Sequence, residues 1–196
     1  MMLSKGALHI LSGSTVAQSI VFQYNPNKVT RSISPRLVGG EPRSHSANLR
    51  FGATPDEQYQ MTIEIDALDN LPSKAQQQVA PTDGIYPLLS GLELLMGPSV
   101  SEMRANQTQL QAGTLQVAPY QAPSLLLDWG EKRIVPVTIA SYSVDEDFFN
   151  AALAPMRASV QLGLRVVTSD DVRSANKLSK SYLSYQLFKE TEAGYL

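Results

Sequence analysis

The chain has 196 residues, of which 43% are hydrophobic, and its formal net charge at pH 7 is −2. This length and composition predict a folded globular protein of one domain, or of one domain with an appendage. The low, scattered charge argues against a nucleic-acid partner. The absence of cysteine excludes disulfides, thiolate zinc sites and cysteine nucleophiles.

Membrane segments are not expected either. After Met1–Lys5, the stretch is broken by polar residues and lacks the apolar run of a signal peptide. No window approaches the length of a membrane span. The sequence therefore predicts no direct membrane insertion and a protein that stays in the cytoplasm unless a larger assembly carries it out.

The first predicted strand has a period of two. Ile20, Phe22 and Tyr24 recur at every second position, and Asn25-Pro26-Asn27 supplies a turn. A polar stretch rich in glycine, Arg36 to Ser46, is typical of a loop.

Two further strands are expected before the first helix. One begins at Leu49 and Phe51. In the other, one face meets the core and the opposite face is polar. Its apolar face comprises Tyr59, Met61, Ile63 and Ile65, and its polar face comprises Gln60, Thr62, Glu64 and Asp66.

One internal helix is predicted over Ile85–Met96. Asp83 is its expected N-cap, Pro87 lies in its first turn, and Gly97-Pro98 ends it. Its apolar stripe is interpreted as core packing. The stripe consists of Ile85, Leu88, Leu89, Leu92, Leu95 and Met96.

The following segment, Ser99 to Pro123, is poor in bulky apolar residues and fits either an excursion loop or a weak hairpin around Gly113. Leu125 to Leu127 then leads into a hairpin turn at Asp128-Trp129-Gly130-Glu131. The return strand, Ile134 to Val144, has apolar residues on both faces and is expected to be covered on both. Pro136 is expected at an edge or a bulge, because it has no N–H to donate.

The last predicted strand, Arg157 to Val167, has the clearest alternation in the chain. Its apolar face comprises Ala158, Val160, Leu162, Leu164 and Val166, and its polar face comprises Arg157, Ser159, Gln161, Gly163 and Arg165.

The composition changes after Val167, which predicts a domain over residues 1–168 and a helical extension over 169–196. Ser169 or Asp170 is the expected cap of a helix reaching about Phe188. An isolated helix of this length is marginal in water. Its apolar stripe therefore needs a surface to cover. The stripe comprises Val172, Leu178, Tyr182 and Tyr185.

Catalytic chemistry is not predicted. His9 and His45 have no acid or nucleophile at a recognised spacing. Asp145-Glu146-Asp147 lacks the ligand spacing of a calcium loop and is interpreted as a solvated turn. No phosphate-binding or dinucleotide motif occurs. The sequence thus predicts no enzyme, no cofactor and no metal.

Five separated motifs carry a resemblance to a known family. They are Phe22-Gln-Tyr-Asn-Pro26, Leu49-Arg-Phe-Gly52, a Pro-Leu-Leu helix near Leu92, Trp129-Gly130 and Ala154-Pro-Met-Arg-Ala158. In order and spacing, from about Ile20 to Val167, the chain resembles the tube-like baseplate proteins of contractile injection systems. These systems are phage tail-like particles that puncture membranes.

The resemblance implies an α+β fold, with an antiparallel β-sandwich or barrel of the phage tail-tube type, one packed helix and a C-terminal helical extension. It also implies that the last strands of six subunits close a ring around a channel. Ser159, Gln161 and Arg165 would then face the lumen. Alternation alone fits an ordinary solvent-facing sheet equally well.

The function implied by the resemblance is structural. The chain would join the spike to the inner tube and initiate the tube, with the spike, the inner tube protein and other baseplate subunits as partners. The loops Arg36–Ser46 and Ser99–Pro123 are the candidate rim contacts. Relatives often carry a C-terminal LysM module, for which this chain is too short. The resemblance therefore implies that the C-terminal helix docks on a neighbouring subunit rather than on its own barrel. The alternatives are an inner tube subunit of the same machine, or an unrelated small β-rich binding module.

Overall fold

The computed structural model describes residues 4–38, 50–69, 71–113, 120–172 and 177–195. The chain divides into two compact units. Unit 1 comprises Met1–Ile65, Ser124–Asp145 and Ser159–Leu196, and unit 2 comprises Asp66–Pro123 and Glu146–Ala158. This division does not coincide with the predicted boundary between residues 168 and 169, because the C-terminal helix lies in unit 1.

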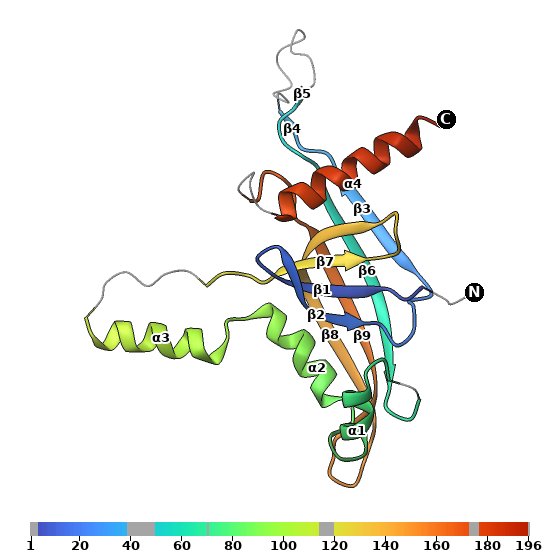
Figure 1. Ribbon diagram of the computed structural model, residues 1–196, viewed down its shortest axis with the longest axis vertical. Coiled ribbons are helices and arrows are strands. Elements are labelled where there is room, and N and C mark those ends of the chain that lie inside the picture. Colours follow the sequence, from blue (N-terminus) through green and yellow to red (C-terminus); the bar gives the residue numbers. More distant parts are fainter. Residues whose placement is uncertain (1–3, 39–49, 70, 114–119, 173–176, 196) are drawn as a thin grey trace. The chain divides into compact units, whose positions relative to one another are not determined.

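A seven-stranded antiparallel sheet forms the framework (Figure 1). Its strand order is β2-β1-β7-β8-β9-β6-β3. The strands are β1 (Ala7–Ser12), β2 (Thr15–Val21), β3 (Val29–Ser34), β6 (Asp56–Asp66), β7 (Ser124–Asp128), β8 (Ile134–Phe149) and β9 (Pro155–Val166). A separate two-stranded sheet pairs β4 (Leu37–Val38) with β5 (Arg50–Phe51).

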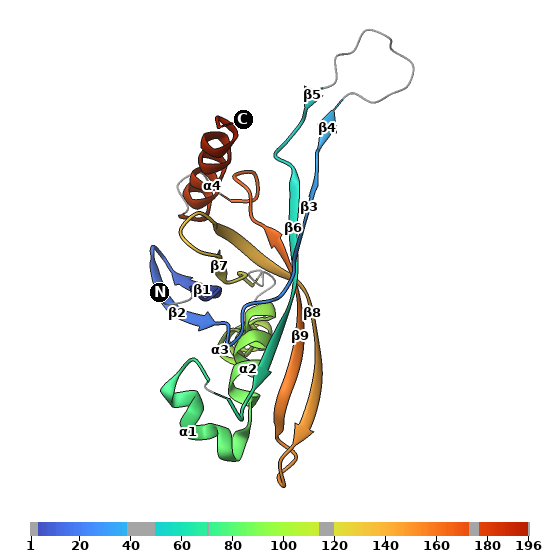
Figure 2. The same cartoon turned by 90° about the vertical axis from the view of Figure 1, so that its right-hand side faces the viewer.

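The predicted α+β class is confirmed, but a closed barrel is not formed. The described sheet ends at two different strands, β2 and β3, which do not pair with each other. Figure 2 shows β1, β2 and β7 lying to one side of β3, β6 and β9.

The predicted alternation of the neighbouring inner strands β6 and β9 is confirmed. In β6, Tyr59, Met61, Ile63 and Ile65 are buried while Gln58, Gln60, Thr62 and Glu64 are exposed. In β9, the five apolar residues Ala158, Val160, Leu162, Leu164 and Val166 are all buried. Both strands therefore turn one face to the core and the other outward.

Two of the sequence motifs have clear structural roles. The side chain of Asn25 accepts a hydrogen bond from the Gly6 N–H at 2.9 Å and donates one to the Ser4 carbonyl at 2.9 Å, which ties the N-terminal segment to the turn. Trp129 packs against Phe22, with ring centroids 6.3 Å apart. The Trp129-Gly130 turn joins β7 to β8 as predicted, with Gly130 at a φ of +85°.

Strand ends differ from the prediction in several places. Strand β2 ends at Val21 rather than at Tyr24. Strand β8 continues through Asp145–Asp147 to Phe149, so this acidic run is not a turn. The prediction that both faces of this strand are covered holds only for Val135–Val137, because residues 138–149 of β8 are half-buried or exposed. Pro136 pairs opposite Leu126 between β7 and β9, so it is not on an edge strand.

Helices occupy more of unit 2 than the sequence predicted. They are α1 (Lys74–Asp83), α2 (Tyr86–Glu93), the 3₁₀ helix η1 (Leu94–Met96) and α3 (Val100–Gln111). Asp83 ends α1 instead of capping the predicted helix, whose N-cap is Ile85. The segment read as a loop or hairpin contains α3, with its capping box at Ser99 and Glu102.

The last helix, α4 (Lys177–Ala193), begins later than predicted. Residues 173–176 lie outside the described residues, and neither Ser169 nor Asp170 caps it. Residues 39–49, which include most of the predicted loop Arg36–Ser46 and His45, also lie outside them. Three segments missed by the prediction, β1, β3 and β4, are strands, and β4 lies within the predicted loop Arg36–Ser46.

Gly84 is required by the close approach of two segments of unit 2. It has a φ of +58°, and a Cβ added to it would lie 2.0 Å from the carbonyl oxygen of Pro155. That oxygen also accepts the Ile85 N–H at 2.9 Å. We expect Gly84→Ala to lower the free energy of unfolding by about 2–3 kcal/mol, since it adds a clash to an unfavourable φ.

A matched control is available at Gly13, which has a φ of +59° and nothing within 4 Å of its Cβ position. Gly13→Ala should cost only the backbone term, about 1 kcal/mol. Urea denaturation of both variants measures the difference. Equal losses would show that the contact with Pro155 does not require glycine.

Candidate functional site

The outward side of four adjacent strands, β3, β6, β9 and β8, forms a continuous polar face. Its side chains border a hollow of about 370 Å³ in unit 1. The polar face is defined by Lys28, Thr30, Gln60, Thr62, Ser141, Ser143, Gln161 and Gly163. All but Lys28 are uncharged, so this surface offers hydroxyl and amide groups to water or to a polar partner.

The three residues predicted to face a lumen lie on the outward row of β9. Gln161 is exposed and borders the hollow. Ser159 donates a hydrogen bond to Glu64 at 3.0 Å. Arg165 is held by Asp171, at 3.2 Å between Nη1 and each carboxylate oxygen. The row is therefore neutral at Gln161 and salt-bridged at Arg165.

Gly163 brings β9 close to β8 on this face. A Cβ added to Gly163 would lie 2.1 Å from the Oγ of Ser141. The glycine thus leaves room for the neighbouring serine, and both residues border the hollow.

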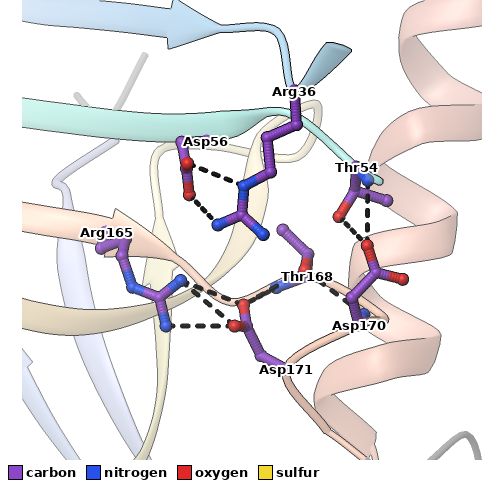
Figure 3. Close-up of polar contacts among 7 residues, drawn as sticks. All are labelled: Arg36, Thr54, Asp56, Arg165, Thr168, Asp170 and Asp171. Carbon is purple, nitrogen blue, oxygen red and sulfur yellow. Dashed lines mark hydrogen bonds and ion pairs between the residues drawn. The ribbon is translucent and has the colours of Figure 1, made fainter. Parts of the chain in front are cut away.

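A polar junction lies where β6 and β9 meet the segments that precede β4 and follow β5 (Figure 3). The guanidinium of Arg36 binds both carboxylate oxygens of Asp56, with its Nε donating at 2.8 Å. Thr54 donates to Asp170 from its N–H at 2.9 Å and from its hydroxyl at 2.6 Å. Asp171 in turn accepts the Thr168 N–H at 2.9 Å. The junction ties the base of the β4–β5 hairpin to the connector between β9 and α4.

Electrostatics of the polar junction depend on ionised carboxylates. The hydrogen bond from Arg36 lowers the pKa of Asp56, and the hydrogen bonds from Thr54 lower the pKa of Asp170. For Asp171, burial acts to raise the pKa, but the bond from the Thr168 N–H and the charge of Arg165 together lower it. The junction is therefore formed at neutral pH and weakens as the carboxylates protonate in acid.

A buried carboxylate, Glu57, fastens α4 to the sheet. Its side chain is 1% exposed. It accepts hydrogen bonds from the Tyr185 hydroxyl at 2.7 Å, from Lys189 at 2.8 Å and from Arg31 at 2.6 Å. Tyr185 also shares a 2.6 Å hydrogen bond with Tyr59. The cluster joins β3, β6 and α4.

Glu57 stays ionised in this site. Burial acts to raise its pKa, but the hydrogen bonds from Lys189 and Tyr185, with the charges of Lys189 and Arg31, outweigh burial and lower it from 4.5. For Lys189, burial together with the charge of Arg31 lowers the pKa more than Glu57 raises it. Lys189 Nζ lies 2.8 Å from Glu57 Oε2, and Arg31 Nε lies 2.6 Å from Glu57 Oε1. Two cationic donors on the two oxygens support a charged carboxylate.

We expect Glu57→Gln to lower the free energy of unfolding by about 2 kcal/mol at pH 7, because Lys189 and Arg31 lose their counter-charge while the shape is kept. Since folding lowers the pKa of Glu57, its contribution is complete above about pH 4.5 and is lost as the pH falls through the folded value. Urea denaturation between pH 3 and 7 should therefore show the variant and the original chain converging in acid. Glu64→Gln, at an exposed position of β6, is the control. If the difference in free energy of unfolding between Glu57→Gln and the original chain did not change with pH, Glu57 would not be ionised in its contact with Lys189 and Arg31.

The apolar stripe predicted to contact a neighbour is instead used within the chain. Leu178, Tyr182 and Tyr185 are buried. Leu178 packs with Leu11, Leu126 and Val167, and Val172 packs against the same cluster. The prediction that this stripe docks on a neighbouring subunit is therefore wrong, because the sheet of its own chain supplies the surface it covers. Leu183 and Leu187, on the other side of α4, are exposed.

One hydrogen-bonded constellation was missed by the sequence analysis. His9 Nδ1 lies 2.7 Å from Ser19 Oγ, and His9 Nε2 lies 3.2 Å from Asp128 Oδ2. The three residues come from neighbouring strands β1, β2 and β7, at partly exposed positions, and spacing along the sequence gives no sign of them. His9 lies directly opposite Ser19 in the β1–β2 pair, and Asp128 lies opposite Ala7 in the β1–β7 pair, so the arrangement is a cross-strand polar contact.

No group of three or more His, Cys, Asp or Glu among the described residues could hold a metal ion. The helices within the described ranges include none long and apolar enough to cross a membrane. No protein-family model matches the chain, and no curated protein matches it at a significant level.

Proposed function

We propose that this chain is a ring-forming baseplate component of a contractile injection system, which joins the spike to the inner tube and initiates tube assembly. The observation that carries the proposal is the polar face. It spans four strands, is uncharged over its middle and lies opposite a buried apolar face. A water-filled channel wall requires such a pairing of faces, because one side must meet water and the other the core.

Two unlike edges support ring formation. On the four-stranded part of the sheet, one edge is β3, whose residues Thr30 to Ser34 are exposed. The other is β8, because the described pairing with β7 covers only Ile134–Val137. Different, complementary edges favour heterologous contacts that close by rotation, and unpaired strand edges can extend a sheet into a neighbouring subunit. Six copies in a ring, assembled in the cytoplasm into a phage tail-like particle, is the arrangement proposed.

Paired cysteine substitutions test the ring, because the chain has no cysteine of its own. Thr30→Cys on β3 combined with Ser141→Cys or Ser143→Cys on β8 should form disulfides between neighbouring subunits. Within one chain these strands are separated by two others, about 14 Å in all. That separation is too large for a disulfide.

The expected result is a ladder of cross-linked species ending at six copies on a non-reducing gel. Thr30→Cys with Leu183→Cys, an exposed position on α4, is the control and should give none. In assembled particles, Gln161→Cys should react with a small maleimide but not with one attached to a large polymer. A monomer without cross-links at either position would contradict the ring.

Copy number separates the remaining alternatives. An adaptor is present once per particle as a single ring, whereas an inner tube subunit increases with tube length. Particles assembled without this chain should lack full-length tubes if it initiates them. If normally assembled particles do not contain this chain, and the chain is monomeric in solution, the alternative of a small β-rich binding module is supported instead.

A further inference from the structure

The turn between β8 and β9 lies in unit 2 (Figure 2). Several apolar side chains in and beside this turn are exposed. Phe148 is 67% exposed, Phe149 52% and Leu153 74%. Ala151 and Ala152, between them, are exposed as well. We name the segment Phe148–Leu153 the tip. A cluster of solvent-exposed aromatic side chains is typical of a binding site rather than of a solvated turn.

The tip is rigid. The side-chain oxygen of Asn150 accepts the N–H groups of Ala152 and Ala154, both at 2.9 Å. The Asn150 N–H donates to the Ala154 carbonyl at 3.0 Å, and the Leu153 N–H donates to the Asn150 carbonyl at 2.9 Å. The Asn150 amide also donates to the Thr82 carbonyl at 3.0 Å. These bonds hold the apolar side chains in one arrangement, which reduces the entropy lost on binding.

The backbone of the tip is strained at its two most exposed apolar residues. Phe148 has a φ of +54° and Leu153 a φ of +61°, in the left-handed region that glycine and asparagine adopt more easily. Folding alone gives no advantage to large apolar side chains at such positions. Strain of this kind concentrates at binding sites, where it fixes the direction of a side chain.

Charge around the tip indicates the kind of surface that it meets. Glu146 and Asp147 directly precede the tip in β8. Asp83 directly follows Thr82, whose carbonyl accepts the hydrogen bond from the Asn150 amide. Arg157, whose guanidinium lies 5.2 Å from the centre of the Phe148 ring, is paired with Asp66 at 2.6 Å. The apolar tip is therefore bordered by acidic groups, which are repelled by anionic lipid headgroups and complement a basic protein surface.

We propose that the tip is a docking knob that inserts into an apolar socket on another protein, with Lys or Arg side chains around the rim of the socket. Phe148, Phe149 and Leu153 fill the socket, and Glu146 and Asp147 pair with its rim. This proposal does not depend on the ring, because it rests on the exposure, rigidity and charge of the tip alone.

A photo-reactive phenylalanine analogue at position 149 of the full chain, in the cells that produce it, tests the proposal. The cross-linked peptide is mapped by mass spectrometry. The expected cross-link goes to one patch of one other protein, with apolar residues at the contact and Lys or Arg beside it. Cross-links to a second copy of this chain, to lipid, or to a patch without basic residues would overturn the proposal, as would no cross-link.

Substitutions then separate the apolar and the charged contributions. Phe148→Asn with Leu153→Asn keeps the left-handed backbone favourable and should lower the cross-link yield at least about tenfold. Asp147→Lys should lower it several-fold, and added salt should weaken the original contact. Leu183→Asn, at an exposed position on α4, is the control and should leave the yield unchanged. If the cross-link yield were unchanged in the Phe148→Asn, Leu153→Asn variant, the proposal that the tip is a docking knob would be wrong.

Discussion

Ending the chain at Val167 should leave a protein that no longer folds cooperatively. Helix α4 buries Leu178, Tyr182 and Tyr185, and burial of three such side chains contributes roughly 5–9 kcal/mol. A whole domain is stable by only about 5–15 kcal/mol. The truncation would also open the cluster around Leu126 and leave Glu57 without Tyr185 and Lys189.

Circular dichroism in the near and far ultraviolet, followed through thermal unfolding, measures this loss. Leu178→Ala is the milder variant and should cost about 2–4 kcal/mol. Leu187→Ala, at a position that is 64% exposed on the same helix, should stay within about 0.5 kcal/mol. A chain ending at Val167 that melts cooperatively at the original temperature would show that α4 is a dispensable appendage.

The second large effect is expected for an aspartate on the inner face of β9. Leu162 is 1% exposed, so Leu162→Asp places an unpaired carboxylate in the core of unit 1 and should cost about 4 kcal/mol or more. Gln161→Asp, one residue earlier, puts the same charge on the polar face and should cost less than about 0.5 kcal/mol.

Urea denaturation of the two variants, with the yield of soluble protein as a second readout, compares the faces directly. Because neighbouring positions of a strand point to opposite sides, the pair differs in burial rather than in location. Comparable stability of both variants would mean that β9 is not buried on the Leu162 side. A greater loss for Gln161→Asp would reverse the register.

The helices show where the sequence held a signal that was not used. The pattern of Ser73 followed by Gln76, and that of Ser99 followed by Glu102, are capping boxes that start α1 and α3. Helix α3 was missed because it has few bulky apolar residues and therefore no apolar stripe in the sequence. In the structure none of its residues is buried. Helix α1 also contains Pro81, which lies in its last turn.

The sequence by itself determined the strands β6 and β9 with their outward and inward faces, the turn at Trp129-Gly130 and the mixed α+β class. Each of these depends on local spacing, which side-chain alternation and turn residues record directly. Only the tertiary structure decided that α4 docks on its own sheet, that Glu57 is buried with Lys189 and Arg31, and that His9 lies between Ser19 and Asp128. These contacts join residues between 10 and 132 positions apart. No local pattern specifies such pairs, because strand order and register decide which distant side chains meet.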